Sequence, residues 1–186
     1  IRDIRSLDDF NGIWNVRLNN LGDEFVISSD QIGLLPEEIH FGVVNINERK
    51  VILNFLNQEL RVSNNFNSAY DIKIIAGDKE YVESMSQDIL SNIPEDFALG
   101  QNYPNPFNPV TNMDYTLPQR SRVTISIYNV LGQEIKNLVD REQDYGFHSI
   151  SWDGTDMNGR EVSSGVYFTQ MRSTSFSQTK KMLLLK

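Results

Sequence analysis

The sequence contains no cysteine, and this absence removes several kinds of chemistry. It excludes disulfide bonds, a thiolate nucleophile, and zinc or iron–sulfur centres held by cysteine. Histidine is scarce, with two residues in 186, and the glycine-rich phosphate loops, the HExxH zinc motif and the GxSxG nucleophile motif are all missing. No apolar run approaches the roughly 20 residues that a bilayer crossing requires, so we expect no transmembrane span.

Positive charge is also in short supply, because 17 basic residues face 25 acidic ones and the net charge is −8. A protein that binds nucleic acid needs a basic face, so we expect no nucleic-acid partner. The last acid is Glu161, whereas Arg172, Lys180, Lys181 and Lys186 follow it. Hydrophobic residues make up 39% and aromatic residues 10%, which is enough for a buried core and excludes wholesale disorder.

Proline marks an internal boundary. Three of the six prolines lie in the run NYPNPFNP, Asn102–Pro109. A residue before proline is driven out of the helical region and proline donates nothing to a sheet, so this run predicts an extended or turning connector. We therefore expect two domains, 1–93 and 94–186. The chain begins at Ile1 without a signal peptide, and we interpret it as the C-terminal piece of a longer protein.

The first domain has the pattern of β structure. Trp14, Val16 and Leu18 alternate with polar residues, and turn residues recur about every ten positions, which predicts a β-sandwich or a small barrel. The expected strands are Ile13–Leu18, Glu24–Ser28, His40–Asn45, Val51–Phe55, Glu59–Ser63 and Tyr70–Ala76. The segment at about 79–93 differs, since its apolar residues have rough helical spacing. A short helix and an extended tether both fit that segment.

The second domain alternates more clearly. Val123, Ile125 and Ile127 are separated by Thr124 and Ser126, which predicts one buried and one solvated face. The expected strands are Asn112–Leu117, Arg122–Tyr128, Glu134–Val139, Phe147–Trp152, Val166–Arg172 and Lys180–Leu185. An Ig-like sandwich of about seven strands follows from this length and spacing. The whole chain is thus predicted to be all-β, with two tandem β-sandwiches.

The turn WDGTDMNG, Trp152–Gly159, offers the strongest candidate for a metal site. Asp153, Asp156 and Asn158 carry the hard oxygen ligands that calcium prefers. Met157 breaks the EF-hand pattern, and the same residues also suit a turn in which Asp and Asn side chains bind backbone amides. The calcium site is a weak candidate, and we expect no cofactor. Trp152 could be a core anchor or a sugar platform.

No catalytic group of residues is visible. His40 and His148 each fall in an expected strand, where histidine is usually structural or solvent-facing. The adjacent acids Asp8–Asp9 and Glu37–Glu38 do not form the separated carboxylate pair of a glycosidase. We therefore expect a protein that is not an enzyme.

The run KKMLLLK, Lys180–Lys186, ends the chain. In a strand, Met182 and Leu184 face one way while Leu183 and Leu185 face the other. One interpretation is a buried closing strand whose lysines protect its edge. The other is an address tag that a second protein recognises by strand addition and cationic contacts.

Five motifs in a fixed order resemble a known domain. After Asn102–Pro109 come VTNMDYTLP, VTISIYNVLGQEI, GFHSISWDGTDMNGREVSSGVYFTQM and KKMLLLK. This order resembles the type A C-terminal sorting domain (Por secretion family) of proteins exported by the type IX secretion system. It is also similar to the Ig-like domain of the flagellar hook-capping protein. The similarity extends from about Phe97 to Lys186.

The resemblance implies protein transport rather than catalysis. It implies that the parent protein reaches the periplasm, that the outer-membrane translocon recognises this domain, and that a sortase attaches the upstream cargo domains of the same chain to the cell surface. Cleavage would fall somewhere in Ser91–Gly100. The motif residues carried over are Asn105, Pro106, Phe107, Asn108, Trp152, Asp153 and Gly154, and those for translocon recognition are Gly165, Val166, Tyr167, Lys180, Lys181, Met182, Leu183, Leu184, Leu185 and Lys186.

Two further expectations complete the analysis. Residues 1–93 resemble, more loosely, a β domain often found beside that sorting domain, which implies a second sandwich without a known activity. The alternative function is an adhesive or carbohydrate-binding pair of sandwiches. That function would need an exposed aromatic strip, for which the candidates are Trp14, Tyr115, Tyr128 and Tyr167.

Overall fold

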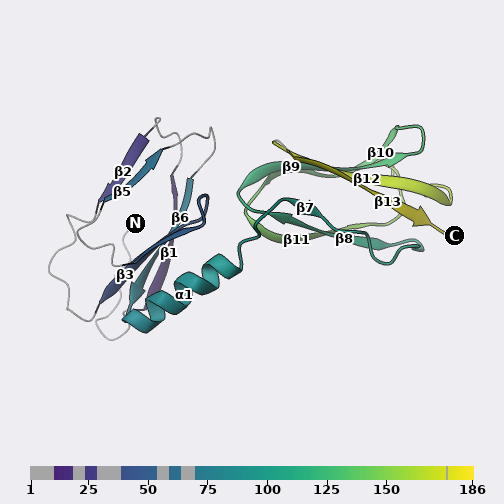
Figure 1. The fold of residues 1–186 in the computed structure, drawn as a ribbon. Coiled ribbons are helices and arrows are strands. Elements are labelled where there is room, and N and C mark those ends of the chain that lie inside the picture. Colours follow the sequence, from purple (N-terminus) through teal and green to yellow (C-terminus); the bar gives the residue numbers. More distant parts are fainter. Residues whose placement is uncertain (1–10, 19–23, 29–38, 54–58, 64–69, 175) are drawn as a thin grey trace. The chain divides into compact units, whose positions relative to one another are not determined.

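The computed structural model describes residues 11–18, 24–28, 39–53, 59–63, 70–174 and 176–186. The chain divides into two compact units, Ile1–Ile93 and Pro94–Lys186. The regular structure is nearly all β-strand, in antiparallel sheets, as Figure 1 shows. The prediction of an all-β fold is therefore confirmed.

The first unit contains a four-stranded antiparallel sheet and a separate pair of strands. The sheet has the order β1-β6-β3-β4, and β2 pairs with β5. Each strand lies where the alternation predicted it, with small differences at the ends, and the last two residues of the predicted Val51–Phe55 lie outside the described residues. The strands are β1 (Gly12–Leu18), β2 (Glu24–Ser28), β3 (His40–Asn45), β4 (Lys50–Leu53), β5 (Glu59–Ser63) and β6 (Tyr70–Gly77).

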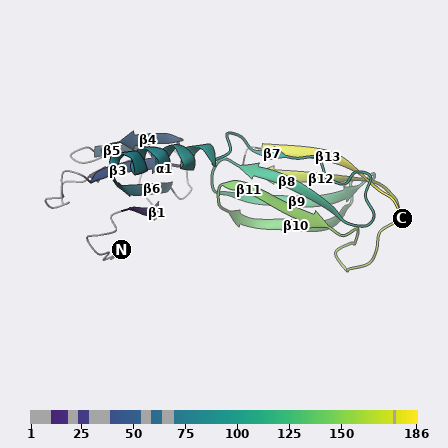
Figure 2. The same cartoon turned by 90° about the horizontal axis from the view of Figure 1, so that it is seen from below.

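The segment that fitted either a helix or a tether is a helix, α1 (Lys79–Ser91). Asp78 caps its first turn, because the Asp78 carboxylate accepts a hydrogen bond from the Tyr81 amide at 2.8 Å. The buried side of α1 rests on Gly42 of β3, where a Cβ atom would come within 2.9 Å of Val82 Cγ1. A glycine in the sheet thus leaves the room that the helix occupies, and Figure 2 shows α1 lying along this sheet.

The second unit is a sandwich of two sheets with the orders β10-β9-β12-β13 and β11-β8-β7. About seven strands were expected, six of them located in the sequence, and seven are found; the additional one, β7, has only two residues and gave no periodic signal. The strands are β7 (Ala98–Leu99), β8 (Thr111–Leu117), β9 (Ser121–Asn129), β10 (Glu134–Gln143), β11 (Gly146–Trp152), β12 (Gly165–Ser173) and β13 (Phe176–Leu184).

The core of the second unit lies between its two sheets. Alternate residues of β8 and β9 point inward and are fully buried, as the period of two predicts. Each buried aliphatic side chain stabilises the fold by about 1.5–3 kcal/mol relative to its exposed state. The main contributors from these two strands are Met113, Tyr115, Leu117, Val123, Ile125 and Ile127.

The last strand begins earlier than predicted. The sequence predicted Lys180–Leu185, whereas β13 starts at Phe176 and pairs with β12 over its whole length. The run of polar residues at 177–179 concealed its first half, because these residues alternate in exposure without alternating in hydrophobicity. Phe176 is anchored by stacking on Phe97, with ring centroids 5.6 Å apart.

Candidate functional site

The motif residues gather at one end of the second unit. β12 and β13 pair there with Gly165 opposite Leu184, and an isolated parallel bridge joins Phe107 to Leu184. Trp152 is the last residue of β11 and pairs with Thr111, the first residue of β8, and both lie at this end of the unit. Segments that are distant in sequence therefore meet around the end of the chain, which is marked C in Figure 1.

The terminal strand buries one of its two apolar faces. Met182 and Leu184 are fully buried, Leu183 is half-buried and Leu185 is 48% exposed. The predicted alternation is therefore confirmed. Lys186 Nζ donates a hydrogen bond to the Glu161 carboxylate at 2.9 Å. These contacts make the run a closing strand, while its use as an address tag stays a prediction.

The free edge of β13 is covered by residues 101–107, which we call the clasp. The Phe107 amide donates to the Leu183 carbonyl at 3.0 Å, and the Leu185 amide donates to the Phe107 carbonyl at 2.9 Å. The clasp is not a regular strand, because Pro104 and Pro106 have no amide hydrogen to donate. Exposed strand edges invite pairing with other chains, and the clasp removes this opportunity at the end of β13.

The side-chain amides of Asn105 and Gln101 form hydrogen bonds with β13 in a segment whose prolines have no amide hydrogen to donate. Asn105 Oδ1 accepts from the Leu183 amide at 3.0 Å, and Asn105 Nδ2 donates to the Lys181 carbonyl at 3.4 Å. Gln101 Nε2 donates to the same carbonyl at 2.9 Å. The Asn105 side chain thus takes the place of a backbone peptide group at the strand edge.

A buried asparagine fixes the shape of the clasp. Asn102 Nδ2 donates to Thr111 Oγ1 at 2.9 Å and to the Pro104 carbonyl at 3.0 Å. The Thr111 hydroxyl donates to the Pro104 carbonyl at 2.8 Å. The sequence analysis did not single out Gln101, which precedes the first motif, or Thr111, which lies in VTNMDYTLP, because only contacts between distant segments reveal their roles.

Three aromatic residues, Phe107 from the first motif and Trp152 and Tyr167 from the fourth, form one cluster behind the clasp. The Phe107 and Trp152 rings lie 5.5 Å apart, and the Trp152 and Tyr167 rings lie 5.1 Å apart. Trp152 Nε1 donates to the Thr155 carbonyl at 2.9 Å, and the Tyr167 hydroxyl donates to the Ser163 carbonyl at 2.8 Å. Trp152 is therefore a core anchor and not a sugar platform. Burial raises the pKa of the Tyr167 phenol.

The turn after Trp152 is held by its own acids. Asp153 Oδ1 accepts from the Thr155 hydroxyl at 2.7 Å and from Lys136 Nζ at 2.9 Å. The Thr155 hydrogen bond, followed by that of Lys136, lowers the pKa of Asp153 to about 2. Gly154 has a φ of 70°, and a Cβ atom there would lie 3.2 Å from the Pro109 carbonyl oxygen. The turn therefore packs directly against the end of the Asn-Pro motif.

The second acid of the turn binds backbone amides. Asp156 Oδ1 accepts from the amides of Asn158 and Arg160 at 2.8 and 2.9 Å, and these bonds lower the pKa of Asp156. Of the residues that the structure describes, no group of three or more His, Asp or Glu side chains could hold a metal ion. The geometry thus matches the turn interpretation of Asp153, Asp156 and Asn158.

The two histidines lie in different units. His148 stacks on Tyr115 at 5.2 Å between ring centroids, and its Nε2 lies 2.9 Å from the Asp144 carbonyl oxygen. His40 lies in β3, whereas Asp8–Asp9 and Glu37–Glu38 fall outside the described residues.

The aromatic strip that carbohydrate binding requires is not formed by the predicted residues. Tyr115 and Tyr167 are buried in the core of the second unit, and burial raises the pKa of the Tyr115 phenol. Trp14 and Tyr128 are half-buried and belong to different units. Tyr115 and Tyr167 are not exposed because side chains alternate along a strand, and at these two positions they point toward the opposite sheet.

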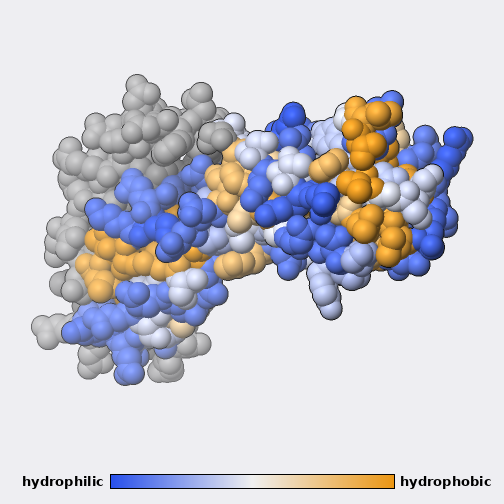
Figure 3. All heavy atoms as spheres, turned by 45° about the vertical axis from the view of Figure 1, so that its right-hand side comes forward, coloured by the Kyte–Doolittle hydropathy of each residue, from blue (hydrophilic) through white to orange (hydrophobic). Residues whose placement is uncertain are grey.

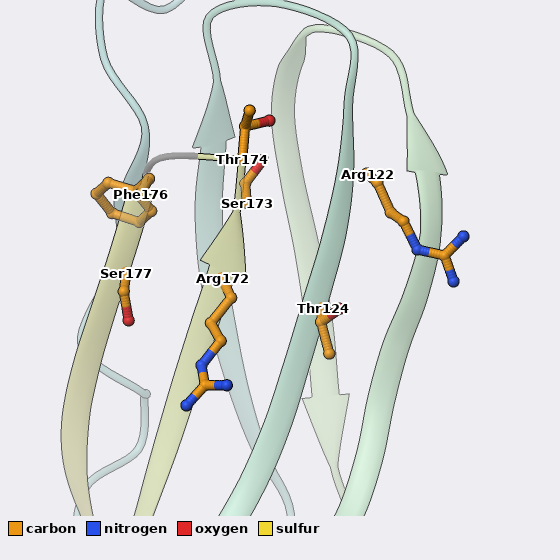
Figure 4. A pocket seen from close by; sticks show the side chains of 7 residues that line it. All are labelled: Arg122, Thr124, Arg172, Ser173, Thr174, Phe176 and Ser177. Carbon is orange, nitrogen blue, oxygen red and sulfur yellow. The ribbon is translucent and has the colours of Figure 1, made fainter.

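An open hollow of about 580 Å³ lies on β9, β12 and β13 (Figure 4). Arg122 and Arg172 line it, but Figure 4 shows their guanidinium groups pointing in different directions. Arg122 is paired with Asp140 at 2.8 Å. The two cations therefore do not converge on one ligand position.

The family comparison concerns the second unit. A family model described as the FlgD Ig-like domain matches residues 109–177. This stretch contains β8 to β12 and the beginning of β13. The match to the FlgD Ig-like domain agrees with the seven-stranded sandwich, and residues 94–186 form an Ig-like β-sandwich. A search of the curated proteins found no match.

Solved structures with similarity to the chain include two components from Porphyromonas gingivalis and a flagellar protein. PorZ, described as an essential bacterial surface component of the type IX secretion system, is 15% identical with a TM-score of 0.34, and the match covers 50% of this chain and 12% of PorZ. Dimeric latent PorU is 16% identical with a TM-score of 0.40, over 86% of this chain and 14% of PorU. FlgD from P. aeruginosa is 23% identical with a TM-score of 0.33, over 40% of this chain and 57% of FlgD.

Within the described residues, no helix combines the length and apolar character that a membrane crossing demands.

Proposed function

We propose that residues 94–186 are a non-catalytic C-terminal module that targets a secreted bacterial protein for type IX secretion and anchors it at the cell surface. The proposal rests on one observation: residues of the separate motifs, including Phe107, Trp152, Tyr167 and Leu184, meet at one end of the sandwich. A sequence order that resembles a sorting domain thus corresponds to one compact cluster around the terminal strand.

The geometry supports recognition of a folded surface. The edge of β13 is covered by the clasp, so a partner meets a closed sandwich end and not an unpaired strand. The partners that the proposal implies are the outer-membrane translocon and a sortase, with the cargo upstream in the same chain. The protein would pass through the periplasm and the outer membrane to the surface.

Deletion of the terminal strand tests the proposal. We expect a reporter fused ahead of residues 1–186 to be exported by a bacterium with a type IX secretion system. Removal of Lys180–Lys186 should abolish export while cytoplasmic expression continues. The measurement is the reporter activity in the medium and on intact cells.

Removal of a strand that buries Met182 and Leu184 also destabilises the sandwich, so a gentler variant is needed. The variant Lys180→Glu with Lys181→Glu reverses two charges and retains both buried side chains. Export of this variant at the parent level would weaken the cationic part of the proposal, and export of the deletion variant would refute the proposal as a whole.

A further inference from the structure

The exposed hydrophobic side chains of the second unit are concentrated at the end that carries the motifs. Among the described residues of 94–186, seven large hydrophobic side chains are exposed, and six lie at this end. Figure 3 shows hydrophobic residues gathered on this end, turned toward the reader at the right. The exception is Phe147, which pairs with Thr116 near the opposite end of the sheet. The six are Tyr103, Val110, Val130, Leu131, Met157 and Leu185.

Sheet register places these residues near one another. Tyr167 of β12 lies between Asn129 of β9 and Met182 of β13, so the turn after β9 and the end of the chain are separated by a single strand. The Met157 amide donates to the Ile135 carbonyl at 3.0 Å, which joins the loop after β11 to the start of β10. Contiguous exposed apolar surface of this kind usually marks an interaction site.

Two of the six residues stand at the top of a rigid turn. Val130 and Leu131 are 67% and 79% exposed. Asn129 Oδ1 accepts hydrogen bonds from the amides of Leu131 and Gln133 at 2.9 and 3.0 Å, and Gly132 adopts a φ of 76°. The turn is thus fixed by Asn129 and Gly132, and the side chains of Val130 and Leu131 are held outward without contributing to its hydrogen bonds. We call these two residues the apolar tip.

Charge argues against a lipid surface as the occupant. A loop that inserts into a bilayer surface usually has lysine or arginine beside it, which binds anionic headgroups. The segment 129–134 contains no basic residue and ends in Glu134, and the next basic residue, Lys136, donates a hydrogen bond to Asp153.

Size argues against a second copy of this chain. A stable protein interface uses roughly 20–30 residues on each side. Six exposed hydrophobic side chains at one end provide too little surface for that, but two protruding side chains suit a small pocket on a partner protein.

We propose that the apolar tip, Val130 and Leu131, inserts into an apolar pocket of a protein of the export machinery. This inference rests on the proposed function and assigns its docking point to the turn after β9. A pre-organised turn loses less conformational entropy on binding than a flexible loop does, so the tip is suited to specific docking.

The test is export of the reporter fused ahead of residues 1–186 with Val130→Ser and Leu131→Ser. We expect export to fall about tenfold or more, as for the loss of a binding hot spot. The matched control is Phe147→Ser, which removes an equally exposed hydrophobic side chain at the opposite end and should be exported like the parent. Thermal unfolding of the purified chains should show unchanged stability, and the milder pair Val130→Thr with Leu131→Asn covers the case in which the serine variant unfolds.

The possible results distinguish a failure of the docking inference from a failure of the proposed export function. Parent-level export of both tip variants refutes the inference and leaves the proposed function standing. If the parent chain is not exported, the proposed function fails and the inference fails with it. Tip-dependent binding of the chain to phosphatidylethanolamine–phosphatidylglycerol vesicles, or tip-dependent dimerisation in sedimentation velocity, would also overturn the inference, because either would identify a different occupant.

Discussion

At the scale of the residue, Phe107 connects the clasp to the core. Its backbone bridges to the terminal strand on both sides, while its side chain is 2% exposed and packs on Trp152. One residue therefore covers the strand edge and fills the space behind it. Phe107 therefore stabilises both the edge of β13, through its backbone, and the core, through its ring.

Replacement of Phe107 by alanine should destabilise the second unit by about 3–5 kcal/mol, because it leaves a cavity beside Trp152. Denaturant unfolding followed by tryptophan fluorescence measures the change. The control is Asn108→Ala, since Asn108 is exposed and should alter stability by less than about 0.5 kcal/mol. Equal stabilities of the two variants would contradict the packing role of Phe107.

Asp153 makes the stability of the turn depend on pH. Its folded-state pKa is lowered from 3.8 to about 2, chiefly by the Thr155 hydroxyl and then by Lys136. A lowered pKa means that the charged carboxylate stabilises the folded state above pH 3.8, and that this contribution is lost as the pH falls toward 2. We expect Asp153→Asn to reduce the loss of stability across this window, as measured by thermal unfolding at several pH values. An identical pH dependence in parent and variant would contradict the assignment.

At the scale of the element, the clasp forms hydrogen bonds with the free edge of β13, the last strand of the chain. β13 is an edge strand, and the outer groups at Lys181, Leu183 and Leu185 bind residues of the clasp. A proline-containing segment cannot continue the sheet, so it covers the edge without creating a new edge that could pair further.

Asn105→Ala should open this edge while leaving the core intact. The loss of two hydrogen bonds is expected to lower stability by about 1–3 kcal/mol and to accelerate hydrogen exchange at the Leu183 amide. Hydrogen exchange followed by NMR or mass spectrometry gives the measurement, with Asn108→Ala as the matched asparagine. Unchanged protection of the Leu183 amide would show that Asn105 does not hold the edge.

At the scale of the whole molecule, the chain consists of two compact units, each with its own sheets. Among the described residues, the core cluster of the second unit is formed by residues between 97 and 184, and the clasp that covers the last strand lies within 94–186. The contacts described above for the candidate site all join residues of the second unit.

A fragment of residues 94–186 should fold by itself. We expect it to unfold cooperatively, with a midpoint close to that of the second unit in the full chain, in calorimetry or denaturant titration. A fragment of residues 102–186 is the informative comparison, because it lacks Phe97 and Leu99 and should be less stable. Failure of the longer fragment to fold would show that the first unit supports the second.

The local pattern of the sequence determined much of this protein. Alternation in Val123, Ile125 and Ile127 predicted β9, and the same period predicted that Met182 and Leu184 share one face of the terminal strand. These features depend on the two-residue period of a strand, which is a property of neighbouring residues. The choice between a helix and a tether at 79–93 was left open, because rough helical spacing does not show whether a surface such as the one at Gly42 is there to bury Val82.

The clasp was decided by tertiary structure alone. Asn105 binds residues 76 and 78 positions further along the chain, and Gln101 binds one 80 positions away. Such contacts depend on the order of strands in the sheet and on the register of β13, neither of which leaves a periodic trace in the sequence. The sequence by itself could therefore determine most of the strands and the two faces of the last strand, while only the folded sandwich decided which face is buried and that an Asn-Pro segment covers the strand's edge.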